Sequence, residues 1–334
     1  MPTSSTTTSE LGQRLQADLG DAYHIERELP RGGMSRVFAA RETALNRTVV
    51  IKVLSPELAV TLSAARFKRE IQLAARLQHP HIIPLLNTGH AVDSLFFTMP
   101  LVDGESLRDR INRERPMAIE NVARILEEIS SAIEYAHEQG VVHRDIKPEN
   151  VMFFHDRAVV LDFGIGKALT AATDDNIRNS GARITQSGMS LGTPIYVSPE
   201  QAAGDPDLDH RADIYSLGIV AYEMICGHPP FSGRTPQMIF AAHAHDDPQP
   251  IQERRPETPA TLAKIVMRCL AKLPKDRPQS AGELVKALRA GSPVYAMFAI
   301  PASGVRGAFA RIPVWVPWLI AAAATATAVV LGLK

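Results

Sequence analysis

The sequence contains little cysteine and no excess of charge of either sign. Its two cysteines, Cys226 and Cys269, lie far apart in segments that are expected to be helical. Such a pair excludes a disulfide framework or a cysteine-based metal site, and we expect two small, buried thiols of a reducing compartment. Lys and Arg together number 36, as do Asp and Glu, so the net charge offers no electrostatic support for nucleic-acid binding.

The sequence also lacks an apolar run near its start and any internal repeat. Residues 1–10 are rich in serine and threonine, so they are not expected to act as a secretory signal. We expect residues 1–20 to be a disordered or short helical tail. In contrast, 45% of the 334 residues are hydrophobic, which is enough for a sizeable core, and the length suits two lobes with appendages.

Residues 314–333 form a long stretch without a charged residue. As a helix, about 20 residues span about 30 Å, the thickness of the hydrocarbon layer of a membrane. Trp315 and Trp318 lie at its start, where amphipathic rings favour the membrane interface. We therefore predict a single transmembrane helix, with a buried C-terminal helix as the alternative. Two arginines precede the stretch and one lysine follows it, which places the preceding domain in the cytoplasm, and no extracellular sensor domain is expected.

Up to about position 100 the chain is expected to form mostly strands, and beyond it mostly helices. β-branched and alternating segments predict strands at residues 22–29, 37–40, 48–54, 82–83 and 94–99. A helical period predicts helices at residues 62–77, 119–137, 212–226, 261–270 and 281–288. Residues 291–313 carry several prolines and glycines and are expected to be a linker.

Two polar motifs lie near the middle of the chain. The first reads His143-Arg144-Asp145-Ile146-Lys147-Pro148-Glu149-Asn150, and the second reads Leu161-Asp162-Phe163-Gly164. Together they supply one carboxylate, a lysine and an amide within six positions, and then a second carboxylate beside a glycine. Phosphoryl transfer needs one carboxylate to orient a hydroxyl and accept its proton, and an amide and another carboxylate to hold magnesium on the phosphates. Two unrelated polar loops are the alternative.

With these motifs the sequence resembles the bacterial protein kinases of the eukaryotic-like serine/threonine class, from about Tyr23 to about Leu288. The resemblance implies an α+β, two-lobed protein kinase fold over residues 21–290, with a small β-rich N-lobe (residues 21–100) and a larger helical C-lobe (residues 101–290). It implies transfer of the γ-phosphoryl group of ATP to Ser or Thr hydroxyls of protein substrates, with Mg²⁺ or Mn²⁺ as the metal. Members of the family often form homodimers that autophosphorylate in trans.

The resemblance also assigns the site residues. Asp145 and Lys147 act on the acceptor hydroxyl and the transferred phosphoryl group, and Asn150 and Asp162 hold the metal. Lys52, in the strand at residues 49–52, binds phosphate oxygens and is held in place by Glu70 of the following helix. The nucleotide is also expected to contact the glycine-rich loop and the hinge between the lobes, at Leu29, Pro30, Arg31, Gly32, Gly33, Met34, Ser35, Arg36, Val37, Met99 and Leu101.

The glycine-rich loop departs from the family pattern. Pro30 stands where the first family glycine usually is, and Ser35 stands where the third is. Proline fixes φ and has no N–H to offer a phosphate, so we expect a stiffer loop that binds ATP more weakly. These departures support the alternative of a non-catalytic, kinase-shaped binding module, whereas the complete set of polar site residues argues against it.

Residues 165–191 are polar, rich in Gly, Ser and Thr, and expected to be a mobile loop. By resemblance they form the activation segment, in which Thr185 and Ser187 are the expected autophosphorylation sites and Arg144 is the expected partner of the added phosphate. Residues 192–200 shape a peptide-binding platform in protein kinases, which disfavours a kinase of small molecules.

Structural roles are expected for three further groups. Glu200 should form a buried ion pair with Arg277, and Asp213 should bond to the backbone of the catalytic loop. His143 is expected to be a packed histidine rather than a base. The string His243-Ala244-His245-Asp246-Asp247 has no further metal ligands at suitable spacing, so it is expected to be a solvated loop.

Overall fold

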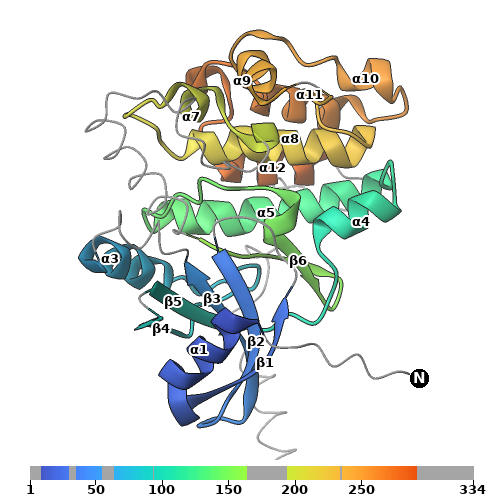
Figure 1. The fold of residues 1–334 in the computed structure, drawn as a ribbon. Coiled ribbons are helices and arrows are strands. Elements are labelled where there is room, and N and C mark those ends of the chain that lie inside the picture. The colour runs from blue at the N-terminus through green and yellow to red at the C-terminus, as the bar shows by residue number, and fades with distance from the viewer. Residues whose placement is uncertain are drawn as a thin grey trace, which may run out of the picture. The chain divides into compact units, whose positions relative to one another are not determined.

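The structure is a computed structural model that describes residues 9–29, 35–54, 64–92, 94–163, 194–233 and 235–291, with only the backbone for residues 64–68 and 291 (Figure 1). Met1–Leu288 form one compact unit, and Arg289–Lys334 form a second. The candidate site residues up to Asp213 all belong to the first unit. Its first part is rich in strands and its second part in helices, as the sequence predicts.

A five-stranded antiparallel sheet, in the order β1-β2-β3-β5-β4, makes up most of the N-lobe. The strands are β1 (Tyr23–Leu29), β2 (Ser35–Glu42), β3 (Arg47–Leu54), β4 (Asn87–Ala91) and β5 (Ser94–Pro100), and helix α3 (Ala64–Ala74) lies between β3 and β4 in the sequence. Side chains alternate along a strand, so Val49 and Ile51 enter a core on one face of the sheet and Val50 and Leu54 a core on the other. The sheet therefore has an apolar layer on both faces.

Helix α1 (Glu10–Leu19) covers one of these faces, although residues 1–20 are expected only to be a disordered or short helical tail. Leu15 is fully buried in the cluster that contains Phe38 and Ile51. The backbone N–H of Val92 donates to Oδ2 of Asp18 at 2.6 Å, which ties the helix to the turn after β4. The helix is thus an integral part of the N-lobe.

The C-lobe is built around α8, whose residues are buried along almost the whole helix. It packs against α5 and α11, and Gly218 allows the close approach to α11, since an added Cβ would lie 2.7 Å from Cβ of Cys269 (Figure 1). The helices are α4 (Leu107–Arg113), α5 (Ile119–Glu138), α7 (Pro199–Ala203), α8 (Arg211–Cys226), α9 (Pro236–His245), α10 (Ile251–Arg254), α11 (Ala260–Cys269) and α12 (Ala281–Gly291). A hairpin of β6 (Val151–Phe154) and β7 (Arg157–Val160) and the short turns η1 (Gly20–Ala22), η2 (Pro148–Asn150), η3 (Pro194–Tyr196) and η4 (Pro274–Asp276) complete the described elements.

Two further sequence predictions concern the cysteines and the transmembrane helix. Cys226 and Cys269 are both free thiols; Cys269 is buried as expected, whereas Cys226 is only half-buried. Within the described residues, no helix has the length and apolarity needed to cross a bilayer. Residues 314–333, predicted to be a transmembrane helix, lie outside the described residues, as does the predicted linker at 291–313 except for Gly291, which ends α12.

Candidate active site

Lys52 projects from β3 on the same face of the sheet as Val50 and Leu54, because side chains alternate along a strand. Its Nζ atom lies 2.6 Å from Oδ2 of Asp162, and the two side chains are 12% and 7% exposed. Phe97, opposite Lys52 on β5, places its ring centre 5.9 Å from Nζ, which adds a cation–π contact. Lys52 of the sheet and Asp162, which lies 110 positions later in the chain, thus form one largely buried ion pair.

The structure differs from the sequence prediction in the partner of Lys52. An ion pair with Glu70 of α3 is expected, whereas the described ion pair of Lys52 is formed with Asp162. Glu70 and Asp162 carry the same charge, so the partner of Lys52 depends on which carboxylate the fold places beside it. Asp162 has a left-handed φ of 65°, a backbone state that ordinary residues adopt only at a cost. The role of Glu70 in holding Lys52 remains a prediction.

The catalytic-loop side chains lie within hydrogen-bond distance of one another. Nζ of Lys147 lies 2.9 and 2.7 Å from the two carboxylate oxygens of Asp145. The amide nitrogen of Asn150 donates to the backbone oxygen of Asp145 at 2.8 Å and to its Oδ2 at 3.0 Å. Asp145 and Lys147 are 48% and 34% exposed, so both can meet a large substrate. The loop therefore presents a carboxylate, an ammonium and an amide together at the surface.

Hydrogen bonds from the backbone link this loop to Asp162. The N–H of Leu161 donates to the oxygen of Asn150 at 2.9 Å, so the residue before Asp162 is tied to the loop. His143 is fully buried, its Nε2 lies 2.7 Å from the oxygen of Leu161, and its ring meets Phe163 edge-on at 4.7 Å. The packed, structural role expected for His143 is confirmed.

Asp213, which is buried in α8, anchors the loop to the C-lobe core. Its carboxylate accepts hydrogen bonds from the backbone N–H groups of His143 at 2.8 Å and Arg144 at 2.7 Å, and it lies 2.8 Å from Nε2 of His137. Burial opposes the charged form, but the bond with His137 and the N–H donors outweigh it and hold the pKa of Asp213 below its ordinary value. Arg144 has a left-handed φ of 67°, so the anchor fixes the loop in a strained conformation. The expected bond between Asp213 and the loop backbone is confirmed.

Four residues predicted to contact the nucleotide come together in one hydrophobic cluster on the face of the sheet that carries Lys52. Val37 and Met99 are buried in it, and Leu29 and Leu101 are half-buried at its border. This face therefore offers apolar surface beside a lysine, which suits a flat base attached to phosphates.

Of the other residues predicted to contact the nucleotide in the glycine-rich loop, only some lie on the face of the sheet that carries Lys52. Ser35 begins β2 opposite Leu54, on the face of Lys52. Arg36 points to the other face, where its guanidinium pairs with Glu28 and donates to Oγ of Ser9 at 3.1 Å. A contact of the Arg36 side chain with the nucleotide is therefore not supported by this arrangement. Pro30, Arg31, Gly32, Gly33 and Met34 lie outside the described residues, as do Thr185 and Ser187.

Residues 194–200 are fastened to the C-lobe at several points. Glu200 receives both ends of the Arg277 guanidinium, at 2.6 and 2.8 Å, and Arg277 is fully buried. Removal of one partner from such a buried pair typically costs about 3–5 kcal/mol. Nε2 of Gln201 donates to the backbone oxygen of Arg144 at 2.8 Å, which ties this segment to the catalytic loop. The expected ion pair between Glu200 and Arg277 is confirmed.

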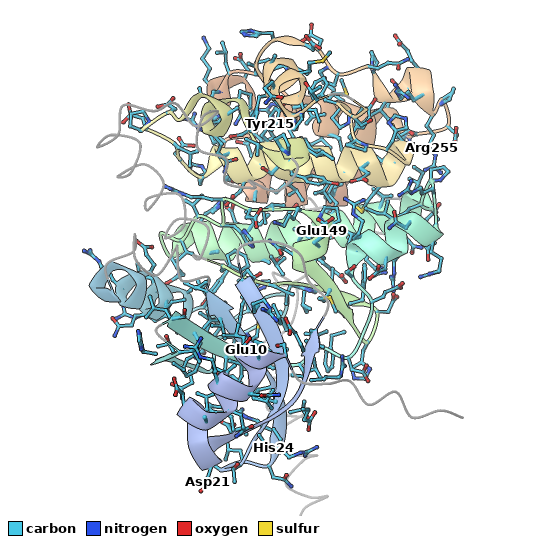
Figure 2. All side chains as sticks on the ribbon, viewed as in Figure 1. Glu10, Asp21, His24, Glu149, Tyr215 and Arg255 are labelled. Carbon is cyan, nitrogen blue, oxygen red and sulfur yellow. The ribbon has the colours of Figure 1, made fainter. Side chains whose placement is uncertain are left out.

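One polar cluster beside the loop is not evident from the sequence. Arg108 of α4 donates to Glu149 at 2.8 Å and to the buried Glu223 at 2.7 Å, and it contacts the hydroxyl of Tyr196 (Glu149 is labelled in Figure 2). Burial opposes the charge on the guanidinium, yet the bonds to the two glutamates raise the pKa of Arg108 above its ordinary value. Four elements meet at this cluster: α4, the catalytic loop, η3 and α8. Only tertiary packing brings them together, so no spacing in the sequence predicts it.

The chain belongs to the protein kinase domain family, whose sequence pattern matches residues 23–288. It is 40% identical over 272 residues to the serine/threonine-protein kinase PknB of Mycobacterium tuberculosis, covering 80% of this chain and 42% of that protein. It is 41% identical over 269 residues to the serine/threonine-protein kinase pkn3 of Myxococcus xanthus, covering 78% of this chain and 48% of that protein. This chain thus matches less than half the length of these curated relatives.

A solved structure agrees with the fold. The crystal structure of a mutant form of the Mycobacterium tuberculosis PknI kinase domain matches with a TM-score of 0.63 and 28% sequence identity, and the match covers 87% of this chain and 99% of that one. The two-lobed kinase fold predicted from the sequence is therefore confirmed. Helix α1 precedes the residues that the family pattern matches.

Proposed function

We propose that this chain is an ATP- and magnesium-dependent protein kinase that phosphorylates Ser and Thr hydroxyls of proteins. The observation that carries the proposal is the meeting of Lys52 with Asp162 at 2.6 Å beside the hydrogen-bonded set of Asp145, Lys147 and Asn150. Membership of the kinase family and relatives named as serine/threonine kinases support it. A non-catalytic binding module is disfavoured, because all the polar groups that the chemistry needs are present.

The residues fit a magnesium–nucleotide complex. Within the described residues, no group of three or more His, Cys, Asp or Glu could hold a metal alone. Magnesium commonly takes only one or two protein oxygens and completes its shell with phosphates and water. Asp162 offers a carboxylate, and Asn150 uses its amide nitrogen toward Asp145, so its Oδ1 remains to bind a metal. A magnesium ion held by these two residues would offset the negative charge of the phosphates.

The protein groups then have distinct tasks. Lys52 exchanges its bond with Asp162 for phosphate oxygens of ATP. Asp145 orients the acceptor hydroxyl and takes its proton as the new bond from the hydroxyl oxygen to the γ-phosphorus forms and the bond to the β–γ bridging oxygen breaks. Lys147, which can turn from Asp145 to the transferred group, stabilises its negative charge. Manganese can replace magnesium at oxygen ligands of this kind.

Further parts of the proposal concern the chain outside the described residues. Phosphorylation at Thr185 or Ser187, in trans within a homodimer, orders the segment at residues 165–191 by pairing with Arg144. Residues 314–333 tether the protein to the cell membrane as a single span, with the kinase domain at residues 21–290 on the cytoplasmic side.

The proposal is tested by incubating the full-length chain with labelled ATP and magnesium, as wild type and as Asp145→Asn. Because Asn keeps the size of the side chain but cannot accept the proton, we expect incorporation of label to fall by at least about 100-fold. Chelation of the metal should abolish incorporation in the wild type. Equal incorporation by the two proteins would refute the role of Asp145, and phosphoamino-acid analysis identifies the acceptor.

A further inference from the structure

His243 lies inside the C-lobe, contrary to the solvated loop that its polar neighbours predict. It belongs to α9 and is fully buried. Its Nδ1 lies 3.0 Å from the hydroxyl of Tyr215 on α8, and its ring meets Phe231 edge-on at 5.1 Å (Tyr215 is labelled in Figure 2). The helix around it is secured by Lys272, whose Nζ donates to the backbone oxygens of Ala242 and His243 at 3.1 and 3.0 Å.

The second nitrogen of this ring is buried and has no hydrogen-bond partner among the described residues. The Tyr215 hydroxyl is the natural donor to Nδ1, so the proton of the neutral ring lies on Nε2. Burial, and then the nearby charge of Lys272, lower the pKa of His243 to about 4, so the ring is neutral at physiological pH. An N–H donor is therefore held in the interior without an acceptor from these residues, a state that native proteins rarely retain without a reason.

The donor faces η3, the turn that leads into the platform segment. Helix α9 packs against η3. The backbone groups of Pro194 and Ile195 lie near the ring and raise its pKa in opposition to burial, although these contacts fall short of full hydrogen bonds in this structure. The end of η3 and the chain beyond it are already fixed, because Ser216 Oγ donates to the oxygen of Tyr196 at 2.7 Å and Gln201 bonds to Arg144 of the catalytic loop. The start of the segment is thus the part that His243 can still adjust.

We propose that His243 is a positioning residue for the protein substrate, whose Nε2–H donor holds the backbone of residues 194–195 in the place that presents an acceptor peptide to Asp145. The proposal rests on the proposed kinase function. It requires a donor at this point, not merely a ring that fills space. The donor forms its hydrogen bond when the turn moves toward α9, and a bound peptide favours that position.

Two substitutions distinguish the contribution of the N–H donor from that of the ring's size and shape. His243→Phe keeps a ring of similar size and lacks the N–H group, whereas His243→Gln retains an amide N–H at comparable reach. The probe is a synthetic peptide of residues 179–193 of this chain, which contains Thr185 and Ser187. With the full-length chain, we expect His243→Phe to raise the KM for the peptide roughly tenfold, the value of about one hydrogen bond, with the KM for ATP unchanged. His243→Gln should recover most of the loss.

Peptide binding to the same variants in an Asp145→Asn background, measured by fluorescence anisotropy, gives a readout that does not need turnover. The same roughly tenfold difference between Phe and Gln at position 243 is expected there. Equal peptide affinity for the Phe, Gln and wild-type forms would overturn the positioning role, as would parallel losses for peptide and ATP. Failure of the kinase proposal would show differently, as equal phosphoryl incorporation by wild type and Asp145→Asn.

Discussion

At the scale of single residues, the active site combines exposed reactive groups with buried groups that hold them. Asp145 and Lys147 are partly exposed, whereas Asp213 and Arg277 are almost or fully buried and bonded on several sides. The reactive side chains can therefore exchange partners at little cost, while the buried ones cannot. His243 belongs to the buried group and differs from it in keeping one donor that no described residue satisfies.

The buried imidazole of His243 predicts a dependence of stability on pH. Its pKa is about 4 in the folded protein and 6.5 ordinarily, so between these values only the unfolded chain takes up the proton. The stability that the neutral ring contributes is complete above pH 6.5 and is lost as the pH falls toward 4. The groups that face the ring are the Lys272 ammonium, which disfavours protonation, the backbone groups of Pro194 and Ile195, which favour it, and the Tyr215 hydroxyl.

This dependence is measured by urea unfolding of wild type and His243→Phe at about pH 7.5 and about pH 5. The Phe variant cannot take up the proton, so its free energy of unfolding should fall by about 2 kcal/mol less than that of wild type. Contributions of all other titrating groups cancel in this difference. Parallel loss of stability in both proteins would mean that the ring already accepts a proton in the fold.

At the scale of elements, α1 extends the N-lobe beyond the residues that the family pattern matches. Gln16 accepts from the N–H of Ile25 at 2.7 Å and donates to the oxygen of Tyr23 at 2.9 Å, so the helix braces the start of β1. Ser9 caps its first turn and donates to Glu28 at 2.7 Å, near the end of the same strand. One helix thus contacts both ends of β1, the strand that leads into the glycine-rich loop.

Removal of the buried part of this helix should destabilise the N-lobe. We expect Leu15→Ala to lower the free energy of unfolding by about 2–4 kcal/mol, because Leu15 is fully buried between α1 and the sheet. Arg14→Ala, at the neighbouring exposed position, is the matched control and should change stability by less than about 0.5 kcal/mol. Urea unfolding measures both, and similar values for the two variants would show that α1 is not docked in solution.

Much of the fold and of the site could be predicted at this scale, because the relevant patterns are local. The helix predicted at residues 119–137 is α5 (Ile119–Glu138), and the one predicted at 212–226 is α8 (Arg211–Cys226). The strand predicted at residues 82–83 is wrong, since Ile82 forms only an isolated bridge with Val160. Helix α1 carries Leu11, Leu15 and Leu19 four residues apart, a helical pattern that the Ser/Thr-rich start of the chain obscures.

The details that could not be predicted depend on how segments far apart in the sequence pack against one another. The resemblance assigns Glu70 to Lys52 and Asp162 to the metal, but either carboxylate carries the charge that Lys52 needs, so residue type alone does not predict the pair of Lys52 with Asp162. The burial of His243 could be inferred from the sequence only by grouping it with Ile239 and Ala242, which lie on the same buried face of α9. The polar run that follows in the sequence favours the opposite interpretation.

At the scale of the whole molecule, the kinase family accounts for one compact unit and leaves the rest of the chain to be explained. The family pattern ends at residue 288, where the first unit also ends. The second unit includes residues 314–333, which carry no charged side chain. A membrane tether of the kind proposed would confine the kinase domain to substrates near a bilayer.

The tether is tested by fractionation of cells that express the full chain. We expect the wild type in the membrane fraction, resistant to extraction by high salt and released by detergent. Ala323→Arg combined with Ala324→Arg should move the protein to the soluble fraction, because each arginine near the centre of a spanning helix costs about 2.5–3.5 kcal/mol on insertion. Ala323→Leu with Ala324→Leu is the matched control. Recovery of the wild type in the soluble fraction would rule out the span.

The attachment of the catalytic loop to Asp213 has a mechanical consequence. Two successive peptide N–H groups of the loop bond to a helix at the centre of the C-lobe, while Lys52 reaches Asp162 from a different lobe through a single ion pair. Movement of the β-sheet during nucleotide exchange would therefore lengthen the contact between Lys52 and Asp162. The backbone of the catalytic loop, which is bonded to Asp213, would keep its position. Under the proposed function, this arrangement would let ADP leave without rebuilding the proton-accepting geometry in each turnover.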